Sequence, residues 1–305
     1  MNGLELSRAF YETHGRPMLE SDFPELLPLL AVGLFGSGSE CLGYDDAVSE
    51  DHDLEPGFCI LLPEEELVDR RQAFLLERAY ARLPRDFMGH TRPVLQPVGG
   101  ARRGVMRTAD FFTKTVGVPN GVLDLRAWLM IPEQALLEAT NGELWHDPFG
   151  EVTRIRADLS RMPGDVRRKR LAGQLLLAGQ AGQYNVPRCL AHGEPEAARL
   201  ACAEFVKRAV SACFLLERRY QPYYKWTFRA LRELPALSEL AAPLGALLTQ
   251  PDTQTIESVC AALSETLRAQ GLSERPDAEL ERHAYAVNDT IADAGLRNLH
   301  ILAGV

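Results

Sequence analysis

Two aspartates separated by one residue, Asp51 and Asp53, are the side chains best suited to chemistry in this sequence. On a β-strand, residues i and i+2 point to the same face, so the two carboxylates are expected to lie side by side. Paired carboxylates repel each other unless a cation joins them, and Mg²⁺ prefers carboxylate oxygens together with substrate phosphates. The spacing therefore predicts a Mg²⁺ site at Asp51 and Asp53.

A glycine-rich stretch, GLFGSGSECLGYDD, precedes this pair and begins at the end of an apolar run. Gly36 allows the backbone to approach a phosphate closely, and Ser37 with the amides of the following turn offers donors to a polyanion. A dinucleotide-binding fingerprint is excluded because Cys41 stands where a third glycine is needed, and the chain has no Gly-Lys-Ser/Thr tripeptide. The stretch is interpreted as a phosphate-binding loop; the alternative is an acidic turn without a ligand.

Apolar runs on both sides of this region predict two buried strands, one ending at Phe35 and one over residues 58–62. Helices are predicted over residues 4–14 and 64–83, the second with an acidic first turn. Residues 92–123, with glycines, prolines and β-branched residues, are predicted to form strands and turns.

The stretch LDLRAWLMIPEQALLEATNGE predicts a strand or short bridge and then a helix from Pro132 that is closed by Asn141-Gly142. From about residue 160 the patterns are helical; Ile256, Val259, Cys260, Leu263 and Leu267 share one helix face. The predicted fold class is therefore α+β, with a mixed-sheet domain over residues 1–150 and an all-α helical domain over residues 151–305.

Composition limits the classes of function. The chain has 305 residues with 33 basic and 42 acidic side chains, a net charge of −9, which argues against a long nucleic acid as partner. The six cysteines have no metal-binding spacing and are expected to be buried thiols in a reducing compartment. Without a signal-peptide pattern or a membrane-spanning apolar run, the protein is expected to be cytoplasmic and not bound to a membrane.

The helical half offers further candidates for nucleotide binding. In QAGQYNVPRC, helical spacing aligns Tyr184 and Arg188 with Gln180, and Gln183 adds an amide nearby. The alternative is an ordinary polar helix face, which Pro187 should disturb. Lys225 lies among aromatic residues in YQPYYKW and is a candidate triphosphate contact; the alternative is an aromatic core patch with a lysine that reaches solvent.

A dense basic run at residues 167–170 is a weaker candidate for phosphate or RNA binding. Four basic residues spread around a helix are more often solvated surface, and this is the prediction for the run.

The order of strand, Gly36-Ser37, a gap and Asp51-x-Asp53 resembles the signature of the nucleotidyltransferase superfamily with DNA polymerase beta-like folds. Within it, most of the chain is similar to a bacterial branch that adds a helical domain, related to antibiotic nucleotidyltransferases. The resemblance implies a nucleoside triphosphate donor, Mg²⁺, and transfer of a nucleoside monophosphate to a hydroxyl. The residue between the aspartates is usually apolar in that family, whereas here it is His52.

The family commonly adds a third carboxylate, on a later strand, that acts as the base. Asp124 has the expected apolar flanks, and Asp110 competes with it. The sequence thus predicts a Mg²⁺-dependent nucleotidyltransferase with an unknown small-molecule or protein acceptor. The alternatives are a non-catalytic nucleotide-binding regulator, in which the base is missing, and an antitoxin-like module that restrains a partner protein.

Overall fold

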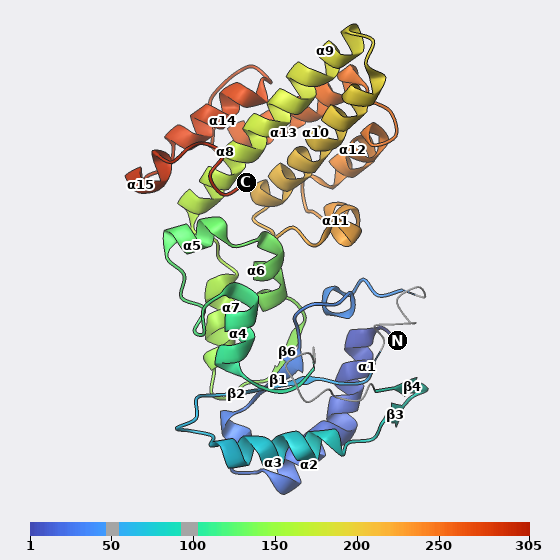
Figure 1. The fold of residues 1–305 in the computed structure, drawn as a ribbon, viewed down its shortest axis with the longest axis vertical. Helices are drawn as coiled ribbons and strands as arrows, with labels where there is room; N and C mark the ends of the chain where they lie inside the picture. Colours follow the sequence, from blue (N-terminus) through green and yellow to red (C-terminus); the bar gives the residue numbers. More distant parts are fainter. Residues whose placement is uncertain (47–54, 93–102) are drawn as a thin grey trace. The chain divides into compact units, whose positions relative to one another are not determined.

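The computed structural model describes residues 1–46, 55–92 and 103–305. These form two compact units, which we call unit 1 (Met1–Val122 and Ala135–Arg161) and unit 2 (Leu123–Gln134 and Met162–Val305). The fold is α+β, with a mixed sheet in unit 1 and helices in unit 2, as Figure 1 shows. The predicted domain boundary at residue 150 precedes helix α7 (Glu151–Leu159), which the structure assigns to unit 1.

The sheet of unit 1 has the strand order β5-β2-β1-β6. Its strands are β1 (Ala31–Leu34), β2 (Cys59–Leu62), β5 (Gly104–Arg107) and β6 (Glu143–His146). Strand β1 is antiparallel to β2 and β6, whereas β2 is parallel to β5. The end of β1 and the beginnings of the other three strands therefore meet at one end of the sheet, which we call the loop end.

Strands β1 and β2 are fully buried, and this confirms the two strands predicted from the apolar runs. Helices on the sheet supply the rest of this core, and a two-stranded ribbon lies beside it. They are α1 (Gly3–Phe10), a π-helical turn (Tyr11–Gly15), α2 (Arg16–Asp22), α3 (Arg70–Ala81), β3 (Asp86–Phe87) and β4 (His90–Thr91). The predicted helix over residues 64–83 begins only at Arg70, because Asp69 is its N-cap and forms a capping box with Gln72.

Two segments that were predicted as strands are helices. Within residues 92–123, β5 confirms one strand, but helix α4 (Thr108–Val116) stands where further strands were expected. It buries Phe112 and Val116, four residues apart, and ends at Gly117, which is in the left-handed conformation. Helix α5 (Leu125–Met130) replaces the bridge, because the Asp124 carboxylate accepts from Ala127 N–H and caps the helix. Helix α6 (Glu133–Thr140) ends just before Asn141-Gly142, as predicted.

Unit 2 packs its helices around α8 and α10, as Figure 1 shows. Its helices are α8 (Gly164–Ala178), a π-helical segment (Gly179–Asn185), α9 (Val186–Ala191), α10 (Pro195–Leu216), α11 (Tyr224–Leu231), α12 (Ala241–Leu247), α13 (Thr253–Ala269), α14 (Leu280–Asp289) and α15 (Ala294–Arg297). The five residues predicted to share a face of α13 are all buried, which confirms that pattern.

The basic run on α8 is not a solvated surface, contrary to the prediction, because three of its four cations are buried. The Lys169 ammonium donates to Asn288 Oδ1, Arg297 O and Leu299 O, and burial lowers its pKa. Arg170 donates to the carbonyl oxygens at the end of α5. These cations bind carbonyl groups that helices leave unpaired at their ends, so the run holds unit 2 together.

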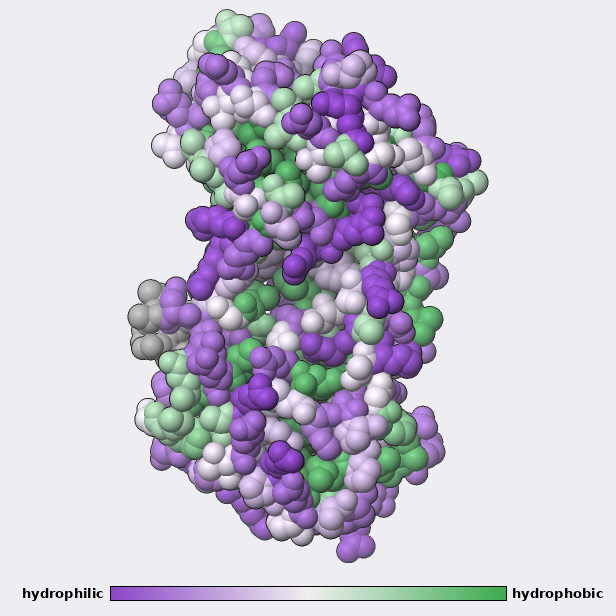
Figure 2. Space-filling view, turned by 180° about the vertical axis from the view of Figure 1, so that it is seen from behind, coloured by the Kyte–Doolittle hydropathy of each residue, from purple (hydrophilic) through white to green (hydrophobic). Residues whose placement is uncertain are grey.

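The two units bury most of the cysteines and leave a largely polar surface. Five of the six cysteines are buried, as predicted, Cys189 is partly exposed, and all six are free thiols. Figure 2 shows polar residues over much of one face, with smaller apolar patches between them. Among the residues that the structure describes, none of the helices combines the length and apolar character that crossing a bilayer requires.

Candidate functional site: a glycine loop at the end of strand β1

The loop that follows β1 contains three successive backbone N–H groups without an acceptor among the described residues, on the exposed Ser37, the half-buried Gly38 and the buried Ser39. Gly36 (φ +106°) and Gly38 (φ +132°) adopt positive φ, a region that glycine enters without penalty. Within the described part of the chain, the N–H groups of Ser37, Gly38 and Ser39 donate to no acceptor, and Ser37 is exposed. Successive unpaired N–H groups in such a turn form a concavity that favours anions. We call residues 36–39 the glycine loop.

The peptide groups of Gly36 are bound at two points by one side chain, that of Asn141. Asn141 Oδ1 accepts from Gly36 N–H at 2.9 Å, and Asn141 Nδ2 donates to Gly36 O at 2.8 Å. Gly36 N–H is therefore not available to a ligand, and the donors begin at Ser37. In the sequence, Asn141-Gly142 is recognisable only as the end of a helix, because its partner Gly36 lies 105 residues away.

The segment that carries Asn141 is itself fixed. Gly142 (φ +64°) donates its N–H to Cys41 O, at the far side of the glycine loop, and a Cβ here would lie 2.0 Å from Leu34 O. Arg156 Nη2, from α7, donates to Thr140 O at 3.0 Å and Asn141 O at 2.6 Å. The turn between α6 and β6 thus requires glycine after Asn141.

A second side chain acts in the same way on strand β2. The Tyr80 hydroxyl donates to Phe58 O at 2.8 Å and accepts from Phe58 N–H at 3.0 Å. Phe58 is the residue before β2. Gly36 and Phe58, which lie on either side of the aspartate pair in sequence, are therefore both bound through their backbone. Both lie at the loop end of the sheet.

A buried ion pair stands beside the glycine loop. Arg103, one residue before β5, donates to Glu40 Oε1 at 3.0 Å, with side chains 9% and 1% exposed. Glu40 Oε2 is buried and receives no hydrogen bond from the described residues. The Glu40 carboxylate also packs against Gly38, where a Cβ would lie 2.4 Å from its oxygens. The guanidinium compensates the negative charge that Glu40 places next to the loop.

The predicted metal ligands Asp51 and Asp53, with His52 between them, lie outside the described residues. Among the described residues, no group of three or more His, Cys, Asp or Glu side chains could hold a metal ion. The predicted site of Mg²⁺ therefore stays a prediction from the sequence.

The two candidates for a third carboxylate are both on helices and not on a later strand. Asp110 is exposed in the first turn of α4. Asp124 belongs to unit 2 and caps α5. Of the later strands, β5 (GVMR) has no carboxylate, whereas β6 begins with Glu143 at the loop end, and Glu143 Oε2 accepts from Trp145 Nε1. The strand placement predicted for Asp124 was wrong, because its side chain stabilises the start of a helix.

The predicted nucleotide-binding residues of unit 2 have different surroundings. Gln183 donates to Glu257 Oε2 and Ala278 O and accepts from Leu280 N–H, so both ends of its amide are engaged within unit 2. Tyr184 and Arg188 are exposed, and the guanidinium lies 5.0 Å from the tyrosine ring centre. The π-helical segment before Pro187 carries the helix into α9 despite the proline.

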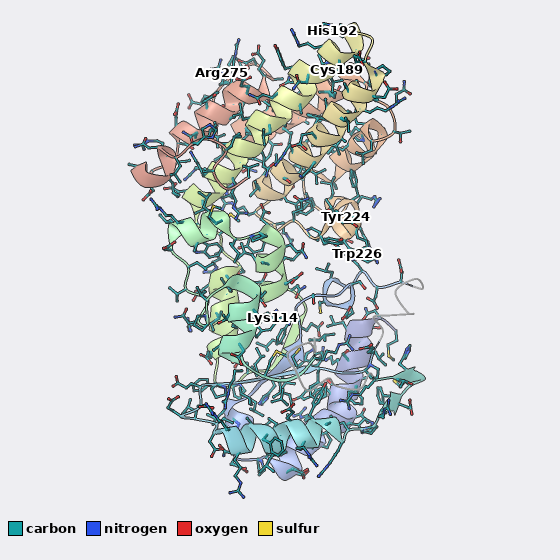
Figure 3. All side chains as sticks on the ribbon, viewed as in Figure 1. Lys114, Cys189, His192, Tyr224, Trp226 and Arg275 are labelled. Atoms are coloured by element: carbon teal, nitrogen blue, oxygen red, sulfur yellow. The ribbon has the colours of Figure 1, made fainter. Side chains whose placement is uncertain are left out.

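Lys225 lies on α11 in an exposed group of aromatic residues. Its ammonium is 4.9 Å from the ring centre of Trp226, and the rings of Tyr223 and Tyr224 are 4.2 Å apart. Figure 3 shows Tyr224 and Trp226 together on this helix. Tyr224 is 78% exposed, so these residues do not form the aromatic core patch that was the alternative.

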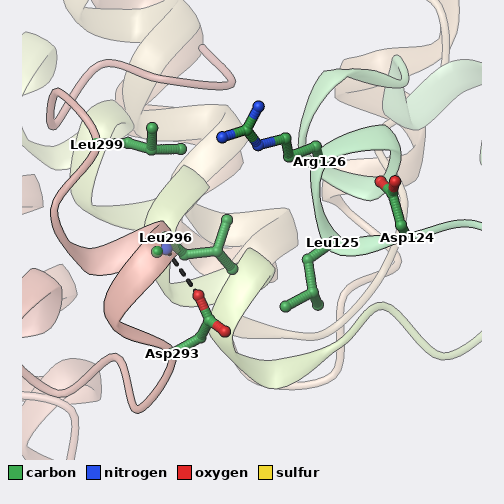
Figure 4. Close-up of a pocket in the computed structure, with 7 residues that line it drawn as sticks. Asp124, Leu125, Arg126, Asp293, Leu296 and Leu299 are labelled. Atoms are coloured by element: carbon green, nitrogen blue, oxygen red, sulfur yellow. Dashed lines mark hydrogen bonds between the residues drawn. The ribbon is translucent and has the colours of Figure 1, made fainter.

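Unit 2 also contains a cavity of about 390 Å³ between α5 and α15. Leu125 and Leu296 face each other across it in Figure 4, and Asp293 accepts from Leu296 N–H. Asp124 and Arg126 also line it. Both aspartates cap short helices, so their carboxylates have a structural role.

The comparisons with known proteins give one match. Residues 128–227, about a third of the chain, match a family model described as a domain of unknown function, DUF4037. No curated protein and no solved structure matches the chain. The matched residues include Asn141 and Arg156 but not the glycine loop or the aspartate pair.

Proposed function

We propose that this protein is a Mg²⁺-dependent nucleotidyltransferase that moves a nucleoside monophosphate from a nucleoside triphosphate to a hydroxyl of an acceptor. The observation that carries the proposal is the glycine loop, where three successive N–H groups have no acceptor among the described residues. A triphosphate has the charge and the acceptor oxygens that such a loop favours.

The sheet topology supports a common location for the parts of this site. Strand β1 ends at the loop end and β2 begins there, so the chain between Gly36 and Phe58, which contains Asp51 and Asp53, leaves and re-enters the sheet at the same end. Arg103 reaches this end from β5. There it offsets the Glu40 carboxylate, which would otherwise place an uncompensated negative charge beside the phosphates.

The proposed chemistry assigns a task to each group. The Ser37–Ser39 N–H groups and the Ser37 hydroxyl hold phosphate oxygens, and Asp51 and Asp53 hold Mg²⁺. The acceptor oxygen bonds to the α-phosphorus, the bond between the α-phosphorus and the pyrophosphate oxygen breaks, and the hydroxyl proton of the acceptor passes to solvent water. When bound, Mg²⁺ neutralises charge on the phosphates and on the leaving pyrophosphate.

A second function, a nucleotide-binding regulator without catalysis, is favoured by one specific observation. Strand β5 has no carboxylate, and Asp110 and Asp124 are on helices. At the loop end, Glu40 is buried and paired with Arg103, and Glu143 Oε2 at the start of β6 is engaged by Trp145 Nε1 and lies 3.6 Å from Arg8. A general base must lie within hydrogen-bond reach of the proton that it removes. A regulator needs the glycine loop and the metal ligands but no such base.

The test follows pyrophosphate release and nucleotide binding in the same samples. Each of the four nucleoside triphosphates is titrated with and without Mg²⁺ into the wild type and into Asp51→Ala/Asp53→Ala. A matched control, Asp22→Ala/Asp158→Ala, removes two exposed aspartates from unit 1. We expect Mg²⁺-dependent binding and slow pyrophosphate release for the wild type and the control, and neither for the site variant.

The outcomes separate the two functions. Binding without pyrophosphate release, across a panel of hydroxyl acceptors, favours the regulator. Absence of binding by the wild type overturns both functions, and the glycine-rich stretch would then be an acidic turn without a ligand.

A further inference from the structure

We propose that Asn141 is a positioning residue for the glycine loop and that Arg156 holds Asn141 in place. This inference rests on the proposed function, because it assumes that the glycine loop binds phosphate. It extends that function to a segment 105 residues further along the chain, at the turn between α6 and β6.

The geometry of one peptide group gives the physical reason. The Gly36 carbonyl and the Ser37 N–H belong to the same planar trans peptide, so they point in opposite directions. Asn141 Nδ2 binds this carbonyl at 2.8 Å, which directs Ser37 N–H away from Asn141. Asn141 Oδ1 binds Gly36 N–H at 2.9 Å and fixes the preceding peptide as well. The first donor of the loop is therefore oriented before any ligand arrives.

This orientation is needed because Gly36 is conformationally free. At φ +106° glycine has no Cβ to restrict it, and the side of Gly36 where a Cβ would project is nearly open, with Phe111 Cε2 at 3.7 Å from a Cβ placed there. Without Asn141, the peptide between Gly36 and Ser37 could rotate at little cost. Ordering this peptide on ligand binding would then cost conformational entropy and weaken the affinity.

Arg156 in turn holds the segment that carries Asn141. Its Nη2 binds the carbonyls of Thr140 and Asn141, and its guanidinium lies 5.2 Å from the ring centre of Phe35, next to Gly36. Burial lowers the pKa of Arg156 to about 10. In the described ranges it forms no ion pair, so its charge next to the loop adds to the attraction for an anion.

A purely structural role is the competing explanation, in which Asn141 only ties α6 to the end of β1. Such a role changes the free energy of unfolding and leaves the affinity of the folded protein for phosphate unchanged. A positioning role changes that affinity. The two are separated by measuring binding under conditions in which every variant is folded.

The experiment is an isothermal titration with inorganic tripolyphosphate and Mg²⁺, because this probe contains the part that all nucleoside triphosphates share. For Asn141→Ala we expect a dissociation constant about tenfold higher than for the wild type, since two hydrogen bonds that hold the loop are lost. The matched control is Asn298→Ala; Asn298 is exposed, and its side chain bonds to none of the described residues. We expect no change for the control.

A double-mutant cycle with Gly36→Ala tests the route of the effect. If Asn141 acts through Gly36, Asn141→Ala weakens binding much less in the Gly36→Ala background than in the wild type. Additive effects would overturn the proposal. If Asn141→Ala does not fold, Arg156→Lys replaces it; this variant keeps the charge and loses the planar donors, and we expect binding about threefold weaker.

Failure of this inference is distinguishable from failure of the proposed function. A folded Asn141→Ala, or a folded Arg156→Lys in its place, that binds tripolyphosphate as tightly as the wild type overturns the positioning role alone. A wild type that binds neither tripolyphosphate nor any nucleoside triphosphate overturns both.

Discussion

At the scale of single residues, Gly36 is needed for its backbone conformation and not because a side chain would lack space. Its φ of +106° is a conformation that other residues rarely adopt, although a Cβ would meet only Phe111 at 3.7 Å. A substitution here therefore measures backbone strain without a steric clash. Gly38 differs, because a Cβ there would collide with the Glu40 carboxylate.

Gly36→Ala is expected to lower the free energy of unfolding by about 1–3 kcal/mol, the usual cost of a non-glycine residue in such a conformation. Gly164→Ala is the control, since Gly164 begins α8 and only the flexible end of Arg168 is near it. The control should be neutral or slightly stabilising. Urea denaturation measures both, and equal stabilities for the two variants would contradict the conformation assigned to Gly36.

At the scale of elements, the Arg170 side chain links the end of α5 to Glu133, the first residue of α6. Arg170 binds three carbonyls at the end of α5 and lies 3.6 Å from Glu133 Oε1, at the start of α6. Glu133 Oε2 also accepts from Gln221 N–H at 3.3 Å. Burial raises the pKa of Glu133 above its ordinary value, and Arg170 opposes this shift only in part. The carboxylate is therefore poorly compensated when it is ionised.

This pKa shift predicts a pH dependence of stability with a definite sign. Because the folded pKa of Glu133 lies above its unfolded value of about 4.3, the folded protein binds more protons than the unfolded chain between the two values. The contribution of Glu133 is thus fully present below the unfolded pKa and is lost as the pH rises through the folded pKa.

Glu133→Gln should remove this fall in stability with rising pH, which is measured by urea denaturation at a series of pH values. The exposed Glu196, in the first turn of α10, offers the control Glu196→Gln, for which the wild-type profile is expected. An unchanged profile for Glu133→Gln would show that Glu133 is not the group responsible.

At the scale of the whole molecule, the sequence predicts the α+β class, the two buried strands and the helical C-terminal region. These follow from the strong apolar patterns of residues 29–35, 58–62 and 253–269. Helix α4 was missed because its threonines and phenylalanines favour strands, whereas the Gly117 cap at its C-terminus and its tertiary packing favour a helix.

The site was less predictable than the fold, for a physical reason. The glycine loop is a local pattern and was found, but its contacts with Asn141, Arg103 and Arg156 join residues far apart in sequence. The buried role of Lys169 was missed for the same reason, since its acceptors follow it by about 120 to 130 residues. Helical periodicity places such a cation on a face but does not give its partners.

The burial of the cysteines predicts how many thiols react rapidly in the folded protein. Cys189 is partly exposed, the other five cysteines are buried, and burial raises the pKa of Cys59 to about 11 and of Cys213 to about 12. A thiol reagent at pH 8 should label one cysteine rapidly in the native protein and six after unfolding, because buried protonated thiols react slowly. Cys189→Ser should remove the rapid phase; more than one rapid thiol would mean that a core opens.

Hydrogen exchange at the glycine loop shows whether its three N–H groups bind phosphate. The amide exchange of Ser37, Gly38 and Ser39 is measured with and without Mg²⁺ and tripolyphosphate, with the buried face of α13 as internal reference. We expect ligand to slow exchange at these three amides and to leave α13 unchanged, because N–H groups without a protein acceptor would gain phosphate oxygens. Ligand binding with unchanged exchange at all three would contradict it.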